Sequence, residues 1–253
     1  MKLLRWLGAS VWTLGLLLGA HQADAQDRLT RSNRFESPQR FAAELRFAFY
    51  SPKIDSDPVL GGQKPYANVF GDSARIAVGL EFDWQALRVP YLGTLGLGAC
   101  VGYTTMSAQA KLVVPRGSQI YSSENTSLDI FPMSGVAVLR ADVFPRAMGI
   151  PFVPYAKVGM GFALWRSYTA TGTSMVDGVV AKGMSWGPHM AGGLMLHLNA
   201  FDEYTARNLD NMLGINHTYL FIEYYSSDLS GFGKKDMLRV GSNGWAFGLV
   251  WEF

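Results

Sequence analysis

The chain alternates large apolar residues with small or polar residues over most of its length. In an extended strand, successive side chains point to opposite faces, so a segment with this period of two has one apolar and one polar face. The alternation is cleanest in residues 74–84, where every second residue is large and apolar. About eight segments show the pattern and are predicted to be strands: 41–50, 74–84, 95–105, 130–143, 154–165, 186–198, 218–225 and 243–253.

The last predicted strand, residues 243–253, carries the strongest form of this pattern. One of its faces is small or charged, and the other is large and apolar up to the final residue. A strand that ends the chain on an aromatic residue and a carboxylate suits a membrane boundary, and it resembles the C-terminal signature strand of bacterial outer-membrane β-barrels. In those proteins the assembly machinery recognises the terminal Phe, so we interpret the outward residues as an assembly signal: Trp245, Phe247, Leu249, Trp251 and Phe253.

The N-terminus has the layout of a secretory signal peptide. Lys2 and Arg5 precede an apolar run at 6–20, and residues 23–25 form an A-x-A cleavage site. The run is shorter than the ~20 apolar residues of a membrane-spanning helix, although an N-terminal anchor is the alternative. We therefore expect a signal peptide at 1–25, a periplasmic tail at 26–40 and an outer-membrane barrel at 41–253.

The composition supports a barrel. Hydrophobic residues make up 49% of the chain and aromatic residues 13%, with 28 glycines, yet the predicted mature part contains no long uninterrupted apolar segment. An exported chain of this kind is either a globular all-β protein or a transmembrane barrel. The net charge of +2 gives no indication of nucleic-acid binding. Cys100 is the only cysteine, so no intramolecular disulfide is expected.

Aromatic residues near the predicted strand ends separate the two barrel types. Transmembrane barrels carry aromatic girdles at both membrane interfaces, whereas a soluble barrel would carry charged outward faces. Several of the predicted strands have almost no charge on their outward face. The expected girdle residues are Trp84, Tyr103, Trp165, Tyr168, Trp186 and Trp251.

The predicted connections alternate between long and short. Transmembrane barrels have long extracellular loops and short periplasmic turns, and both termini are periplasmic when the strand number is even. One connection breaks the rule, since residues 201–214 form an amphipathic pattern that closes at Gly214 and predicts a periplasmic helix between the sixth and seventh strands. The long loops are predicted at 51–73, 107–127, 169–183 and 226–243, and the clearest short turn at 87–93.

The inward faces of the predicted strands collect charges of both signs. An eight-stranded barrel is just wide enough for side chains to fill, and an unpaired charge in such a lumen costs several kcal/mol. We therefore expect a lumen plugged by salt bridges and not an open pore. The predicted lumen charges are Glu44, Arg46, Arg75, Glu81, Asp83, Arg140, Asp142, Lys157, Glu223 and Glu252.

Motifs for catalysis, cofactors or metals are nearly absent from the sequence. A metal site would need His189, His197 and Glu223, but the two histidines lie too far apart along one strand to bind one ion. The glycines near Gly96 lack the spacing of a dinucleotide-binding loop. We therefore expect no cofactor and no metal.

A lipid-modifying enzyme is an alternative that the sequence leaves open. Some small outer-membrane barrels carry a Ser/His site near the outer rim, and His189 lies toward that end of its strand. Ser185, Ser226 and Asp228 are its candidate neighbours. Geometry and not composition makes a catalytic triad, so no catalytic residue is assigned.

Four short segments, 50–55, 69–73, 206–210 and 219–225, resemble a family of small outer-membrane β-barrels from myxobacteria and their relatives. The resemblance covers nearly the whole mature chain and implies a fold and a location. The family has no assigned reaction, so the resemblance transfers no catalytic residue to this chain.

Together these observations predict an all-β, antiparallel, up-and-down transmembrane barrel of about eight strands that is monomeric. Its expected partners are outer-membrane lipids and, during insertion, the barrel assembly machinery. Because loops carry function on such rigid scaffolds, the loop at 52–72 is the best candidate contact surface. We expect a structural or envelope role or an interaction through the loops, and a narrow solute or ion channel is the alternative.

Overall fold

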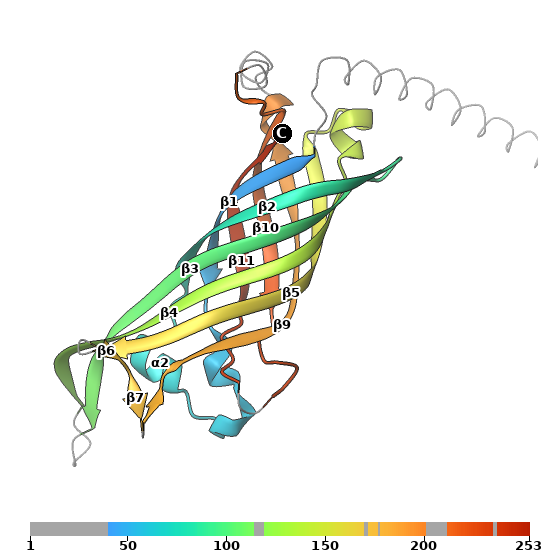
Figure 1. Cartoon of the computed structure of the whole chain (residues 1–253). Coiled ribbons are helices and arrows are strands. Elements are labelled where there is room, and N and C mark those ends of the chain that lie inside the picture. Colours follow the sequence, from blue (N-terminus) through green and yellow to red (C-terminus); the bar gives the residue numbers. More distant parts are fainter. Residues whose placement is uncertain (1–39, 114–118, 170–171, 177, 201–211, 235–236) are drawn as a thin grey trace, which may run out of the picture.

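The computed structural model describes residues 40–253 except 114–118, 170–171, 177, 201–211 and 235–236, and long tilted strands dominate it (Figure 1). The long strands are β1 (Phe41–Tyr50), β2 (Arg75–Val89), β3 (Gly93–Val113), β4 (Gln119–Arg140), β5 (Phe152–Thr169), β9 (Lys182–His197), β10 (His217–Ser227) and β11 (Asn243–Glu252). The short elements are η1 (Lys53–Ser56), η2 (Pro58–Leu60), α2 (Pro65–Phe70), η3 (Phe144–Met148), β6 (Gly172–Thr173), β7 (Met175–Val176), β8 (Val179–Val180) and η4 (Leu198–Ala200).

The long strands close into a ring. The order around the sheet is β4-β3-β2-β1-β11-β10-β9-β5, and an additional pairing between β4 and β5 completes the circle. All of these pairings are antiparallel, and β1 also pairs with β11, so the first and last strands are neighbours. Across the described residues this is an all-β, eight-stranded, antiparallel closed barrel, which confirms that part of the predicted fold class.

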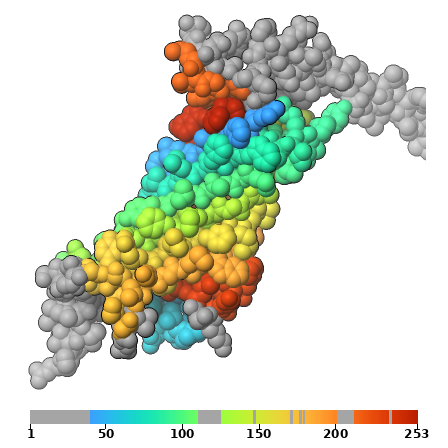
Figure 2. Space-filling view, in the orientation of Figure 1, coloured from blue at the N-terminus to red at the C-terminus, as the bar shows by residue number. Residues whose placement is uncertain are grey.

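The alternation seen in the sequence sets which side chains face out. In β2, Ile76, Val78, Leu80 and Phe82 are exposed on the outer wall, while the residues between them are buried or half-buried. The same rule holds in β1 and β11, where the large residues of the sequence pattern also point outward. In these three strands the outer wall is therefore apolar, and the lumen receives the small and charged residues. In Figure 2 the strands cross this wall as oblique bands.

The two ends of the barrel differ. We call the end where β2 meets β3 the short-turn end, because only residues 90–92 separate these two strands. Phe41 and Phe253 hydrogen-bond to each other at this end, so the first described strand and the C-terminus lie together (top of Figure 1). The opposite end, which we call the long-loop end, carries η1, η2, α2 and the small β7–β8 hairpin.

One predicted loop is wrong. Residues 107–127 were expected to form a long loop, but β3 and β4 continue through most of this range and remain paired from Ser107↔Ser127 to Val113↔Gln119. The pairing of β2 with β3 reaches Tyr103 and that of β5 with β4 reaches Thr126, so the strands run on as a two-stranded ribbon. The sequence shows no apolar alternation here because a ribbon beyond the barrel has no face that must be apolar.

Two smaller predictions also need correction. The fourth strand was expected to run to residue 143, but β4 ends at Arg140. Trp165 was expected in an outer aromatic girdle, but it packs against the apolar cluster inside the barrel, as its position between the outward Leu164 and Arg166 requires.

Other predictions fall on residues that the structure does not describe. The signal peptide at 1–25 lies outside the described residues, as does the tail apart from Arg40. Most of the helix predicted at 201–214 also lies outside them, and α2, with six residues, is the longest α-helix in the described part of the chain. In that part, none of the helices has the length and hydropathy needed to cross a membrane.

Candidate functional site in the barrel lumen

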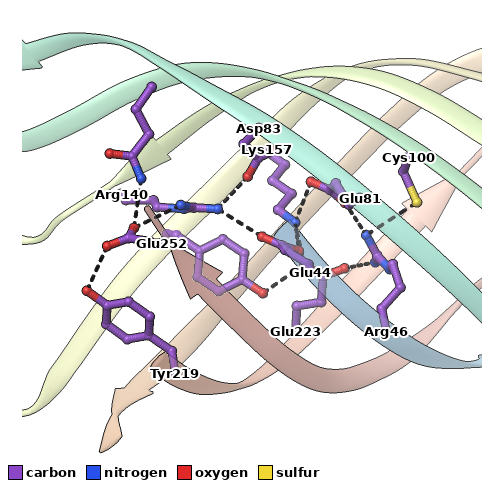
Figure 3. A network of polar contacts seen from close by, with 12 residues as sticks. Glu44, Arg46, Glu81, Asp83, Cys100, Arg140, Lys157, Tyr219, Glu223 and Glu252 are labelled. Carbon is purple, nitrogen blue, oxygen red and sulfur yellow. Dashed lines mark hydrogen bonds and ion pairs between the residues drawn. The ribbon is translucent and has the colours of Figure 1, made fainter. Parts of the chain in front are cut away.

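Charged side chains from six strands meet in the lumen, and they are labelled in Figure 3. Each one sits at an inward position of its strand, so the period of two places it there. The members that form one connected network of ion pairs are Glu44 and Arg46 from β1, Glu81 and Asp83 from β2, Arg140 from β4, Lys157 from β5, Glu223 from β10 and Glu252 from β11.

Lys157 lies at the centre of this lumen network, and its side chain is fully buried. Its Nζ is 2.7 Å from Oε2 of Glu44 and 2.7 Å from Oε1 of Glu81, and 3.7 Å from Oε2 of Glu223. A buried ammonium is tolerated only when it is paired and hydrogen-bonded. Lys157 therefore ties three strands, β1, β2 and β10, to β5 across the lumen.

The two arginines extend the lumen network on either side of Lys157. Arg140 Nη2 is 2.9 Å from Oε1 of Glu44 and also contacts Asp83, while its Nη1 is 3.0 Å from Oε1 of Glu252. Arg46 pairs with Glu81 through one guanidinium nitrogen and with Glu223 through the other. Because Glu44, Glu81 and Glu223 each serve two cations, removing one member disturbs several contacts at once.

The lumen network holds five carboxylates and three cations, so it needs further hydrogen-bond donors. Tyr155 OH donates to Glu223 at 2.8 Å, Tyr219 OH donates to Glu252 at 3.1 Å, and Gln85 Nε2 donates to Glu252 at 2.8 Å. The charge pattern of the sequence did not predict these three donors. The signal was available for the tyrosines, since both occupy inward positions of their strands.

Glycines on neighbouring strands make room for the charged side chains. Gly98 lies opposite Asp83, and a Cβ there would collide with the carboxylate. A Cβ on Gly193 would lie 2.7 Å from Cβ of Glu223, its cross-strand partner. The inward glycines are therefore part of the lumen network's geometry.

Two predicted lumen charges lie elsewhere. Arg75 is at the long-loop end of β2, and its Nη2 donates to the carbonyl of Phe70 at 3.2 Å. Asp142 follows the end of β4 and accepts a hydrogen bond from Thr94 Oγ1 at 2.6 Å. Both lie at the barrel rims. Asp142 follows the end of β4 at Arg140, and Arg75 is the first residue of β2.

An apolar cluster fills the lumen on the long-loop side of the lumen network. Two loops fold inward to build it: the β1–β2 loop contributes Tyr66, and the β10–β11 loop contributes Leu229 and Val240. Tyr50 OH donates to the carbonyl of Val240, and Lys53 N donates to the carbonyl of Gly241 at 2.8 Å. Both loops were predicted to lie outside the barrel, so this second closure of the lumen was not predicted from the sequence.

A cavity of about 60 Å³ lies between the lumen network and the apolar cluster, enough for a few water molecules. Arg46, Cys100, His189, Tyr225 and Ser227 contribute its polar lining. His189 Nδ1 lies 2.5 Å from Ser227 Oγ, so the serine beside the histidine is Ser227.

The other candidate neighbours of His189 are placed differently. Ser185 Oγ donates to the carbonyl of Leu238 at 2.6 Å, and Ser226 pairs with Met190, on the opposite face of the strand from His189. His189 and Ser227 line this cavity, and His189 is a buried, inward residue of β9.

The structure does not bring the hypothetical metal ligands together. His197 packs against His217, with 4.7 Å between ring centroids, while His189 lies in the cavity. A different group, Glu44, Glu81 and Asp83, places carboxylate oxygens within 4.8 Å of one another. Each of these carboxylates already contacts Lys157 or Arg140, so the group is accounted for by the lumen network.

The predicted assembly residues lie on the outer wall. Trp245 and Phe247 are exposed in β11, and Trp245 packs edge-on against Tyr224 of β10. Phe253 lies beside Phe41 and Phe82, with ring centroids 6.4 and 6.3 Å away. The aromatic face therefore covers the line where the barrel closes.

Comparisons with known proteins found matches among solved structures. No protein-family model matches the chain, and no curated protein matches its sequence. OprG of Pseudomonas aeruginosa matches with a TM-score of 0.46 and 14% identity over 86% of this chain and 97% of that one. The Escherichia coli outer membrane protein W matches with a TM-score of 0.44 and 14% identity over 86% and 99%.

A third solved structure is Ail, the attachment invasion locus protein of Yersinia pestis, with a TM-score of 0.40 and 10% identity over 86% of this chain and 99% of that one. The chain is thus structurally similar to small outer-membrane β-barrels. At these identities and scores the similarity assigns neither a family nor a function. It does not assign the myxobacterial family that the short segments resemble either.

Proposed function

We propose that the chain is an integral outer-membrane β-barrel with a closed lumen, which serves as a structural scaffold for its long-loop end. The observation that carries this proposal is the inversion of polarity across the wall. Leu80, Leu97 and Val158 are more than half exposed on the outside, whereas Lys157 and Glu223 are fully buried inside. In water, a barrel with this wall would expose a large apolar surface. In a membrane, lipid would cover that surface.

The closed lumen favours a scaffold over a channel. The lumen network and the apolar cluster lie one after the other along the barrel axis, and each places buried side chains from several strands in the lumen. An ion would have to displace buried ion pairs and then pass an apolar layer, and both steps are costly. A narrow channel remains the alternative function, and a lipid-modifying enzyme the second alternative.

The long-loop end supplies the candidate contact surface, and we assign it to the extracellular side because barrels of even strand number keep their termini periplasmic. Its β1–β2 loop is well organised. The Asp55 carboxylate accepts hydrogen bonds from the backbone N–H groups of Tyr66 and Ala67 at 2.7 and 2.8 Å. A loop held in one shape in this way suits recognition of a partner better than a flexible one.

Membrane fractionation with a heat-modifiability gel tests the proposal. The expected result is recovery of the protein in the outer membrane, with a faster-migrating band before boiling than after. Recovery in the soluble periplasmic fraction without a mobility shift would contradict it. Outer-membrane lipids and the assembly machinery are the expected partners, and a single chain suffices to close the barrel, so a monomeric band is expected.

Planar-bilayer recording and lipid analysis test the two alternatives. We expect no single-channel current from the purified barrel, and steady current steps would establish the channel instead. We also expect an unchanged lipid A mass spectrum in a deletion strain, whereas a changed acyl pattern would establish the enzyme.

A further inference from the structure

The outer wall carries a row of charged residues near the long-loop end. Asp129 in β4, Arg166 in β5 and Lys182 in β9 are direct partners across neighbouring strands. They occupy the alternate positions that also place Leu164 and Met184 on the outside. The row therefore lies on the face that we assign to lipid, beside apolar side chains.

The negative charge of Asp129 is compensated within this row. Its carboxylate is buried, with Arg166 Nη2 3.3 Å away, and it accepts hydrogen bonds from Tyr103 OH at 3.2 Å and Tyr168 OH at 3.4 Å. The Arg166 side chain nevertheless remains 54% exposed. The guanidinium thus contacts Asp129 and lies 5.5 Å from the centroid of the Tyr168 ring, and about half of the side chain stays exposed to a ligand.

Lys182 leaves an excess of positive charge in the row. It lies directly opposite Arg166, and like charges in directly opposite positions of an antiparallel pair are destabilising. Within the described ranges of the chain, Lys182 forms no ion pair. An anion held between Arg166 and Lys182 would remove the repulsion.

The β10–β11 loop adds a second cationic position to the same wall. Lys234 Nζ lies 5.6 Å from the ring centroid of Trp186, an outward residue of β9, and Phe232 packs edge-on against the same ring at 5.4 Å. The loop is fixed there because Gly231 N donates to the carbonyl of Trp186 at 2.7 Å. Lys182 and Trp186 are four positions apart in the extended strand β9, so their backbones are separated by roughly 13 Å.

We propose that this surface binds the headgroup of a lipid that carries two phosphate groups, with Arg166 and Lys182 at one phosphate and Lys234 at the other. Basic side chains form charge-assisted hydrogen bonds with phosphate, and aromatic residues such as Trp186 and Phe232 suit the headgroup level. The acyl chains would lie along the apolar wall next to Leu164. This inference rests on the proposed location in the outer membrane.

The test compares lipid retention by matched variants. Wild type and the double variant Lys182→Gln/Lys234→Gln are refolded into phosphatidylcholine nanodiscs containing a trace of bis-phosphorylated glycolipid or its dephosphorylated form, and native mass spectrometry counts bound glycolipid. The control Lys53→Gln/Lys64→Gln removes the same charge from the β1–β2 loop at the same end of the barrel. Folding of each variant is checked by its mobility shift on boiling.

We expect retention of the bis-phosphorylated lipid to fall about fivefold for each lysine removed, with wild-type retention in the control. The dephosphorylated lipid should bind weakly and equally to all three proteins. Equal retention of both lipids by the wild type, or undiminished retention by the double variant, would overturn the site alone. A wild-type chain that does not insert into the bilayer would overturn the proposed function and this site together.

Discussion

Phe41 and Phe253 join the two ends of the barrel sheet. Phe41 N donates to the carbonyl of Phe253 at 2.9 Å, and Phe253 N donates to the carbonyl of Phe41 at 3.0 Å. Their rings lie 6.4 Å apart on the outer wall, and Phe82 stacks on Phe41 at 5.4 Å. The last residue of the chain therefore completes the hydrogen-bonded ladder and the aromatic cover of the closing seam.

Replacing this aromatic cover should weaken closure. Phe253→Ala keeps the backbone ladder but removes ring contacts with Phe41 and Phe82, and aromatic contacts are worth about 1 kcal/mol beyond the area they bury. We expect a smaller folded fraction and slower refolding into bilayers, measured by the gel shift over time. Phe131→Ala removes another outward ring, which packs against Tyr103 away from the seam at 5.0 Å between ring centroids, and serves as the control. Equal refolding of Phe253→Ala and wild type would show that the seam does not need the ring.

Lys157 should be the most sensitive residue of the lumen network. Lys157→Met leaves Glu44 and Glu81 without their shared cation, and breaking a buried ion pair in this way costs about 3–5 kcal/mol. We expect the urea midpoint of bilayer-inserted protein, followed by tryptophan fluorescence, to fall sharply. Adding Glu44→Gln and Glu81→Gln to the same variant should restore much of the loss, because the excess of carboxylates over cations in the lumen network falls from three to one. A midpoint unchanged by Lys157→Met alone would mean that the ion pairs do not stabilise the barrel.

The lumen network and the apolar cluster should each close the lumen independently of the other. Leu229→Gly with Val240→Gly thins the apolar cluster and opens a route from the long-loop end to the cavity beside Cys100. We expect faster labelling of Cys100 by a small thiol reagent but still no ionic current, since the lumen network closes the barrel beyond the cavity. The outward variant Leu220→Gly should label at the wild-type rate. Steady current through the double variant would show that the apolar cluster is the only effective seal.

The ribbon formed by β3 and β4 should be dispensable for folding. Deleting residues 109–125 and joining residue 108 to 126 through Asn-Gly keeps the last cross-strand pair, Ala108↔Thr126, and supplies a two-residue hairpin turn. We expect a mobility shift on boiling and an unfolding free energy within about 1 kcal/mol of wild type, because loop closure depends only weakly on loop length. A variant that aggregates or no longer shows the shift would mean that the ribbon contributes to the barrel itself.

The sequence predicted the strands best where lipid and lumen impose opposite demands on neighbouring residues. The strand at 41–50 was found with its exact bounds, and the inward charges of β1, β2, β5 and β10 were identified from their alternation. The prediction failed in the ribbon, where neither demand acts, and at Asp142, which lies past the end of β4. It also placed Trp165 by its nearness to a strand end, although the alternation of β5 turns that residue inward.

By itself, the sequence determined the fold class and the polarity of each face, because a period of two is a local property that any strand must express. Only the tertiary structure decided which inward charges meet. Whether Lys157 contacts Glu44, Glu81 and Glu223 depends on the register and tilt of strands far apart in the chain, and no local pattern records either. The same holds for Leu229 and Val240, because the inward fold of a loop is set by the space that the barrel leaves open.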